Sequence, residues 1–207
     1  MKPQVTLRRI QGDAEALLLS SWFGPGSVAA GLTNDLRENV RSSDLLSMNE
    51  QGRLLVFADE NDQPFGLGTF ASKGNPRNYE VAVLVGEESL WETGRGALAA
   101  SRLIDHLFMT LDANKIFALT LVVNPLAIST LSSGGFTLEG RLRDHYYVDG
   151  NFEDCLIWGQ TRAEYDQLTV EVHPESAFTY VPMISGELRE RSERLLEKLA
   201  SEGVLAR

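Results

Sequence analysis

A short glycine-containing loop in the middle of the chain could bind an anion. Gly94 and Gly96 follow a strand-like run and open a long stretch with helical periodicity. Backbone N–H groups free of side chains can turn toward a phosphate, and a helix N-terminus adds positive potential. No Lys-Ser/Thr pair of a Walker loop follows, and Ala99 replaces the third glycine of a dinucleotide fingerprint. The loop therefore predicts either a phosphate-binding turn or a plain turn capped by glycine.

The composition argues against several other kinds of site. The chain has 207 residues and a formal net charge of -10, and the negative excess is spread along its length. Nucleic acid and anionic membrane both require a basic face, so neither is an expected partner. The lone Cys155 and the scattered His106, His145 and His173 show no metal-ligand spacing, so no metal is expected. With no signal-peptide-like start and no long apolar run, we expect a cytoplasmic protein.

Hydrophobic periodicity predicts a regular succession of elements over residues 5–165. Helices are expected from Ala14 to Phe23 behind an Asp13 cap, over 33–46, along the apolar stripe from Leu98 to Leu111, and over 126–131. Strands are expected over 5–10, 53–59, 65–70, 79–85, 116–123, 136–148 and 152–160. The order β-α-α-β-β-β-α-β-α-β-β predicts an α/β (α+β mixed) fold, with helices on both faces of a mixed sheet.

The remaining residues, 166–207, are expected to form a C-terminal extension. Ser185 could cap a charged helix from Glu187 to about Ala200, with Gly203 as its stop. A thin leucine stripe on this helix could pack on its own domain or on a second subunit, so a homodimer is an open possibility.

Three motifs in a fixed order resemble the GNAT (general N-acetyltransferase) superfamily, and within it the RimJ/RimL-like branch. The resemblance covers about residues 5–165. Its motifs are Trp91-Glu92-Thr93-Gly94-Arg95-Gly96, then Asn124-Pro125-Leu126-Ala127 with Gly135-Phe136-x-x-Glu139-Gly140-x-x-Arg143, and finally Asp149-Gly150 with Asp154. The resemblance implies the GNAT fold, in which the central sheet splays open between the strand at 79–85 and the strand at 116–123.

The resemblance also implies that this opening binds acetyl-CoA or another acyl-CoA as co-substrate. The backbone of Val83, Leu84 and Val85 would contact the pantetheine arm and place an N–H near the thioester oxygen. Asn124 would hydrogen-bond the arm or the strand ends around it. The pyrophosphate would be held by Trp91, Glu92, Thr93, Gly94, Arg95, Gly96 and Ala97. The implied enzyme is an N-acyltransferase in which a primary amine attacks the thioester directly, in a ternary complex.

The residues that would move protons are less clearly marked. Glu80 is expected to be the general base, although it could instead cap its strand or pair with a cation. His145 and Tyr146 are the other candidates, and His145 could equally be a structural partner of Asp144. The two acids usual in the superfamily are missing, because Leu131 and Ala127 occupy their positions. Ser129, Ser132, Tyr146 or water would have to protonate the leaving thiolate, or it leaves unprotonated.

Two alternatives remain open at this point. The donor could be a thioester on a carrier protein's phosphopantetheine arm, or the chain could be a non-catalytic acyl-CoA-binding module. The acceptor is not identified, although the acidic surface slightly favours a cationic amine. Trp22 and Phe23, ahead of Gly24-Pro25-Gly26, could line the acceptor's entrance or pack in the core.

Overall fold

The computed structural model describes residues 4–24, 27, 40–148 and 150–171, the last three by backbone only, and then 187, 190–192, 194 and 198. Its elements follow the predicted order. They are β1 (Thr6–Arg8), α1 (Gly12–Ser21), α3 (Ser42–Glu50), β2 (Leu54–Ala58), β3 (Pro64–Ser72), β4 (Asn78–Val85), the 3-10 helix η1 (Glu88–Thr93), α4 (Arg95–Met109), β5 (Lys115–Leu121), α5 (Pro125–Ser133), β6 (Thr137–Val148), β7 (Asn151–Thr161) and α6 (Arg162–Glu171).

The strands form one mixed sheet in the order β1-β2-β3-β4-β5-β7-β6. Only β4 and β5 pair in parallel, and all the other neighbours are antiparallel. β5 lies between β4 and β7, so its run of apolar residues is central in the sheet, as predicted. Among the described residues, no helix is long and apolar enough to cross a membrane.

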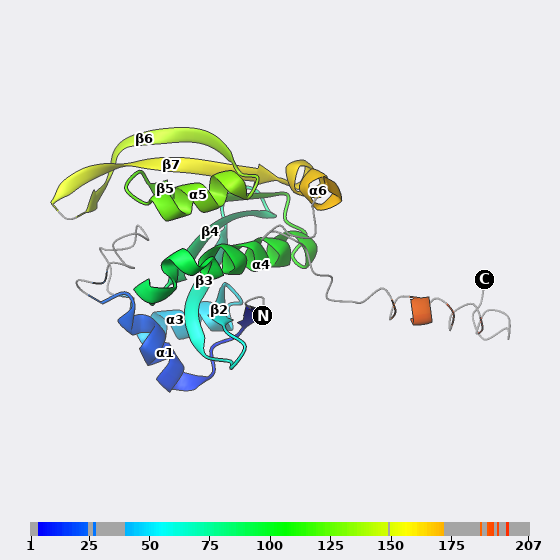
Figure 1. Cartoon of the computed structure of the whole chain (residues 1–207). Coiled ribbons are helices and arrows are strands. Elements are labelled where there is room, and N and C mark those ends of the chain that lie inside the picture. The colour runs from blue at the N-terminus through cyan, green and yellow to red at the C-terminus, as the bar shows by residue number, and fades with distance from the viewer. Residues whose placement is uncertain are drawn as a thin grey trace.

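Helices cover both faces of this sheet, and strand alternation explains the two cores that result (Figure 1). On β2, Phe57 points to the α4 side, where it joins Leu103 and Leu107. Its neighbour Val56 points to the opposite side and packs with Leu19 of α1 and Leu45 of α3. The predicted architecture, with helices on both faces of a mixed sheet, is confirmed.

The first two helices begin at different residues from those predicted. α1 starts at Gly12, so Asp13 lies inside its first turn and does not cap it. Instead the Glu15 carboxylate accepts the Gln11 N–H at 2.6 Å, which satisfies an amide at the helix start. α3 begins at Ser42, nine residues after the predicted start, and residues 33–39 lie outside the described part of the chain. Asp149 of the predicted hairpin turn and most of the predicted helix over 187–200 also lie outside it.

The periodicity missed α6, which crosses the predicted end of the domain at residue 165. Tyr165 is buried and stacks on Phe108 of α4 with ring centroids 4.3 Å apart. The Arg162 guanidinium lies over the same Phe108 ring at 5.1 Å. Through these contacts α6 packs against the C-terminal end of α4 and belongs to the same domain as the sheet.

A buried carboxyl beneath α6 makes stability depend on pH. Asp105 is 8% exposed, and burial raises its pKa to about 6, although the Tyr165 hydroxyl donates to its Oδ1 at 2.7 Å. Between pH 4 and 6 the folded chain keeps a proton that the unfolded chain has lost. Stability therefore falls as pH rises through this range.

Replacing Asp105 with asparagine should remove that dependence, because the amide keeps an acceptor for Tyr165 and carries no charge. We expect Asp105→Asn to raise the free energy of unfolding above pH 7 by at most about 3 kcal/mol, and by progressively less toward pH 4. Urea unfolding at several pH values measures this free energy, with Asp13→Asn at an exposed position of α1 as the control. An equal gain at all pH values would contradict the assignment.

Candidate functional site

The sheet opens between β4 and β5, as the resemblance implied. The two strands pair in parallel from Asn78 with Lys115 as far as Val81 with Ala118. Beyond that point β4 continues beside β3 alone, and β5 continues beside β7 alone. The unpaired edge of β4 runs from Ala82 to Val85, about 13 Å at ~3.3 Å per residue. A row of backbone polar groups therefore lines a gap inside the sheet.

The β3–β4 ladder decides which backbone groups face this gap. The Gly86 N–H donates to the Phe65 carbonyl at 2.9 Å, so Gly86 and Phe65 form a hydrogen-bonded pair. Such pairs alternate along an antiparallel ladder, so the backbone groups of Leu84 also face β3. Those of Val83 and Val85 face the opening. The N–H and C=O of Leu84 thus point toward β3 and its side chain is buried, so this geometry favours Val83 and Val85 over Leu84 as contacts for a pantetheine arm.

The glycine loop lies at the far end of the opening and begins α4. Gly94 adopts φ +79, the left-handed region that glycine favours, and its carbonyl accepts the Leu98 N–H at the first turn of the helix. The Trp91 indole N–H donates to the Val85 carbonyl at 2.9 Å. Trp91 thus fastens the loop to the end of β4 and occupies one of the two Val85 groups that face the gap. The Val85 N–H and the Val83 groups remain on that edge.

Arg95, the cation in the loop, is engaged with carboxylates. Its guanidinium lies 3.8 Å from Asp59 Oδ2 and 3.5 Å from Glu60 Oε1, both in the turn between β2 and β3. The sequence suggested no link between that turn and the loop, because they are more than thirty residues apart. An anion at the start of α4 would therefore compete with two carboxylates for this arginine.

Glu80 lies at the branch point of the opening. It pairs in register with Phe117 of β5, one residue before the last parallel pair. Because alternate residues of a strand point to the same side, Glu80 shares a sheet face with Ala82. Its carboxylate binds the Lys73 ammonium at 2.5 Å. Burial, together with the negative charge of this carboxylate, raises the pKa of the Cys155 thiol to about 11. Cys155 is fully buried and stays protonated, as expected of a small core residue.

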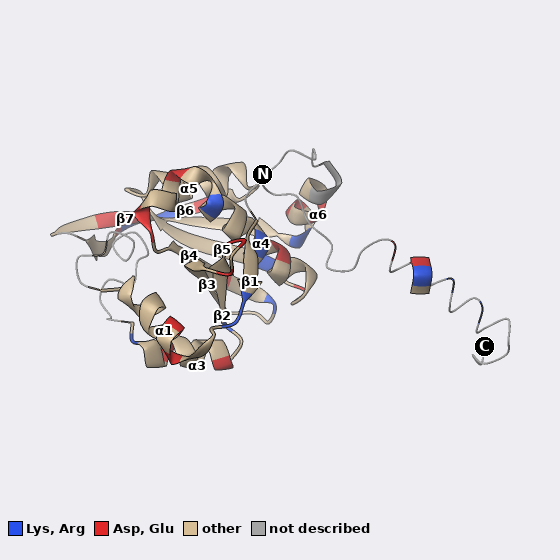
Figure 2. Cartoon of the chain, turned by 60° about the horizontal axis from the view of Figure 1, so that its bottom comes forward, with Lys and Arg blue, Asp and Glu red and all other residues tan. Residues whose placement is uncertain are grey.

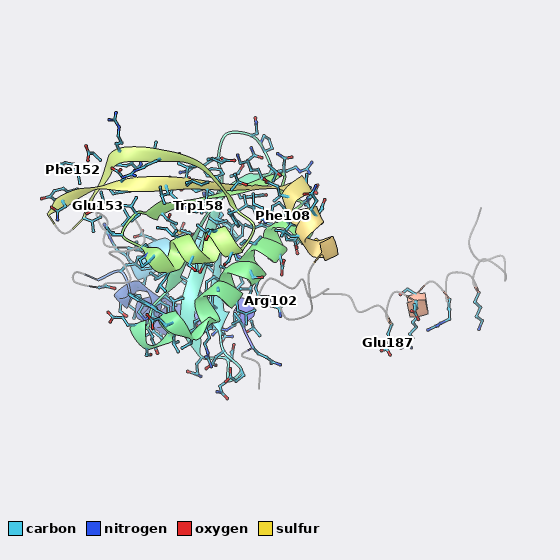
Figure 3. The ribbon with its side chains drawn as sticks, turned by 45° about the horizontal axis from the view of Figure 1, so that its top comes forward. Arg102, Phe108, Phe152, Glu153, Trp158 and Glu187 are labelled. Atoms are coloured by element: carbon cyan, nitrogen blue, oxygen red, sulfur yellow. The ribbon has the colours of Figure 1, made fainter. Side chains whose placement is uncertain are left out.

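His145 and Tyr146 lie elsewhere in the molecule. Tyr146 pairs with Glu153 on the outer part of the β6–β7 hairpin, past the level of the last β5 residue, Leu121. Figure 3 shows Glu153 toward the outer end of that hairpin, away from Trp158. The His145 ring packs edge-on against Tyr146 with centroids 4.6 Å apart. The fold therefore places this pair toward the outer end of the β6–β7 hairpin, whereas Glu80 lies at the base of the opening between β4 and β5.

The remaining predicted residues have structural partners. Asn124 caps α5, where its Oδ1 accepts the Ala127 N–H at 3.0 Å. Leu131, at the position of the usual acid, is buried in the α4 core. The Ser132 hydroxyl donates to the Ser129 carbonyl within α5. None of these contacts places an acidic proton beside Glu80.

The structure adds a cavity that the sequence did not indicate. It lies on the face of α1 and α3 and opens to solvent. Its lining is Phe23, Val40, Leu45, Met48, Leu67, Thr69, Ala82, Val83 and Leu84. Four separate segments of the described chain contribute to it, so no local pattern could have revealed it. Phe23 is thus a lining residue, whereas Trp22 packs in the core against Gly86.

Charged side chains are dispersed over the molecule. In the view of Figure 2, basic residues do not gather into one patch, and acidic residues lie on several elements. Within the described ranges, no group of three His, Cys, Asp or Glu side chains could hold a metal ion. The charge pattern therefore gives no general attraction for an anion.

Comparison with known proteins agrees with this geometry. No protein-family model matches the chain. An N-acetyltransferase of Bacillus licheniformis, named uncharacterized N-acetyltransferase p20, is 25% identical in an alignment of 171 positions that covers 78% of this chain and 95% of that protein.

Solved acetyltransferase structures superpose on most of the chain. A spermidine N-acetyltransferase from Vibrio cholerae, solved with CoA and spermine, matches with a TM-score of 0.68 at 19% identity, over 78% of this chain and 98% of its own. A GNAT family acetyltransferase from Bacillus anthracis matches with a TM-score of 0.64 at 11% identity, over 78% and 98%. By its sheet order, its opening between β4 and β5 and these matches, the chain has the fold of the GNAT N-acetyltransferases.

Proposed function

We propose that the chain is an N-acetyltransferase that moves an acetyl group from acetyl-CoA to a primary amine. The observation that carries this proposal is the gap between β4 and β5, with the backbone of Val83 and Val85 turned into it. A pantetheine arm carries amides that such an edge can pair with, much as an added strand would. The name of the Bacillus licheniformis relative and the CoA complex of the Vibrio cholerae enzyme support the same activity.

We assign different parts of acetyl-CoA to different groups of the chain. The start of α4 offers backbone N–H groups and Arg95 to a pyrophosphate. The N–H groups of Val83 and Val85 can stabilise negative charge on the thioester oxygen as the amine attacks. Acetyl-CoA supplies the activated acyl carbon. A new C–N bond forms at that carbon and its C–S bond breaks, so that the thiolate leaves.

Glu80 is the group we assign to proton removal. An amine substrate arrives as an ammonium ion and must lose a proton before its nitrogen can attack. Glu80 already binds one ammonium, that of Lys73 at 2.5 Å, so its carboxylate can accept such a group. It also lies at the base of the opening, where an arm entering from the α4 end would place its thioester. We propose water as the proton source for the thiolate, because the described side chains place no other acid there.

The test is release of free thiol from acetyl-CoA in the presence of a broad panel of amines, together with detection of the N-acetyl product. CoA should also raise the Tm of the protein. A protein that neither binds CoA nor releases thiol with any amine would refute the proposal. CoA binding without turnover would favour a non-catalytic acyl-CoA-binding module.

One observation favours a second donor, the phosphopantetheine arm of a carrier protein. Asp59 and Glu60 already hold Arg95, which weakens the case for a pyrophosphate at this loop. A carrier-protein donor would bring a single phosphate and would depend less on the loop. Acetylation by acetyl-CoA and by an acetyl carrier protein, measured in parallel, separates the two donors.

Neutralising the two carboxylates should strengthen CoA binding if the loop does hold the pyrophosphate. We expect Asp59→Asn with Glu60→Gln to lower the Kd for CoA about threefold at low salt, because Arg95 is released and repulsion is removed. The gain should shrink with added salt. Asp13→Asn with Glu50→Gln, at exposed positions of α1 and α3, makes the same change in net charge. Calorimetric titration that found no difference between the pairs would count against the loop.

A further inference from the structure

The cavity beside β4 has a lining that selects for apolar groups. Leu45, Leu67 and Leu84 are 1–3% exposed and form its floor. Phe23 and Met48 stand nearer the surface, and Met48 is 37% exposed. Among the described residues of the lining, Thr69 contributes the only side-chain hydroxyl and none is charged. A charged group entering this cavity would lose its hydration without gaining a partner.

The cavity adjoins the position assigned to the chemistry. Ala82 and Val83 line it, and they are also the first β4 residues past the branch point. Glu80 is two residues before Ala82 on the same strand and therefore on the same face of the sheet. Ala82 is exposed although its strand is central, so no element of the described part of the chain covers the sheet face there. A molecule in the cavity thus has one end near Glu80 and its other end among leucines.

We propose that the acceptor carries one amine attached to an apolar group, and that this group occupies the cavity. The inference rests on the proposed function and names its substrate class. The amine would meet Glu80 as a single ammonium, which agrees with an acidic surface. A second ammonium farther along the acceptor would fall among Leu45, Leu67 and Leu84. A polyamine, the kind of ligand named for the Vibrio cholerae enzyme, is therefore a poor fit to this cavity.

Hexylamine and 1,6-diaminohexane form a matched pair for the test, since they differ only by a second amine at the far end. We expect kcat/KM with acetyl-CoA to favour hexylamine by about tenfold or more, because the diamine must bury a charge. From propylamine to hexylamine, kcat/KM should rise about fourfold per methylene buried. Equal use of the two amines, or preference for the diamine, would overturn the inference and leave the proposed function standing.

A carboxylate placed in the cavity should reverse this preference. Thr69→Asp is expected to lower the ratio of hexylamine to diaminohexane kcat/KM by about tenfold or more, since an acid there pairs the second ammonium. Ser43→Asp, exposed in the first turn of α3, makes the same charge change where an acid is tolerated and should leave the ratio unchanged. If Thr69→Asp instead altered only the preference among acetyl-, butyryl- and hexanoyl-CoA, the cavity would hold the acyl chain and the inference would fail.

A binding measurement separates this inference from the proposed function. Hexylamine should bind the full chain without donor, and Thr69→Asp should weaken that binding while circular dichroism remains that of the parent. If no amine is acetylated but this pattern holds, the proposed function fails and the cavity's selectivity stands. If hexylamine and diaminohexane bind the parent equally, the inference is overturned whatever the turnover.

Discussion

Replacing Glu80 with glutamine is expected to lower kcat for amine acetylation by about 10²–10⁴-fold, the range that a positioned general base contributes. The amide cannot take the proton from the ammonium, but it keeps the size of the side chain at the branch point of β4 and β5. KM for acetyl-CoA should change little, since we expect the backbone of Val83 and Val85, and not the Glu80 side chain, to bind the donor. Steady-state kinetics with each substrate varied in turn measures both quantities.

The pH profile distinguishes a base from a merely structural carboxylate. As pH approaches the pKa of the free amine, a growing fraction of the acceptor is already deprotonated, so the deficit of Glu80→Gln should shrink. Glu139→Gln is the matched control, because Glu139 also forms an ion pair with a lysine, Lys115 at 2.6 Å, at the closed end of the β4–β5 pairing. A Glu80→Gln enzyme as fast as Glu139→Gln at neutral pH would remove Glu80 from the mechanism.

A methyl group at Gly86 should destabilise the protein by about 3 kcal/mol, the upper part of the usual range for overpacking a core. A Cβ at this position would lie 2.0 Å from the Trp22 ring, and Trp22 is 9% exposed between α1 and the end of β4. The indole would have to move. The end of β4 would then shift, and with it η1 and the glycine loop at the start of α4. Thermal unfolding should show a loss of roughly 10 °C in Tm.

Two further variants test whether the contact with Trp22 causes this loss of stability. At Gly140→Ala the new Cβ meets only Ile157, at 3.8 Å, so this variant should be near neutral. Trp22→Leu vacates the space, so adding Gly86→Ala to it should cost much less than adding it to the parent, a coupling that a double-mutant cycle measures. Additive effects of the two changes would show that the indole contact is not the cause.

The sequence predicted the order of elements because that order depends on local signals. The apolar stripe from Leu98 to Leu111 and the apolar run from Ile116 to Val123 each predicted the right kind of element, since a helix or a strand buries its own periodic face, although α4 ends at Met109 and β5 at Leu121. α6 was missed for the converse reason. Its main anchors, Tyr165 on Phe108 and Arg162 over the same ring, are contacts with a helix more than fifty residues away.

In the candidate site, too, some features could be predicted from the sequence and others depend on the tertiary structure. The glycine loop could be found in the sequence because a glycine-opened helix is a short local motif, and Glu80 was singled out by the resemblance to the GNAT superfamily. Which β4 residues face the opening could not be found, because the β3–β4 register decides that Val83 and Val85 do and Leu84 does not. Nor could the sequence place His145 and Tyr146 toward the outer end of the hairpin, away from Glu80.

By itself, then, the sequence determined the element order, the fold class and a glycine-containing loop that opens α4, all of which follow from short-range periodicity and turn chemistry. Only the tertiary structure decided that Asp59 and Glu60 pair with Arg95, and that four segments line an apolar cavity beside Ala82. The physical reason is that charge pairing and cavity walls depend on distances between residues far apart in the chain. Those distances exist only once the sheet has fixed its register.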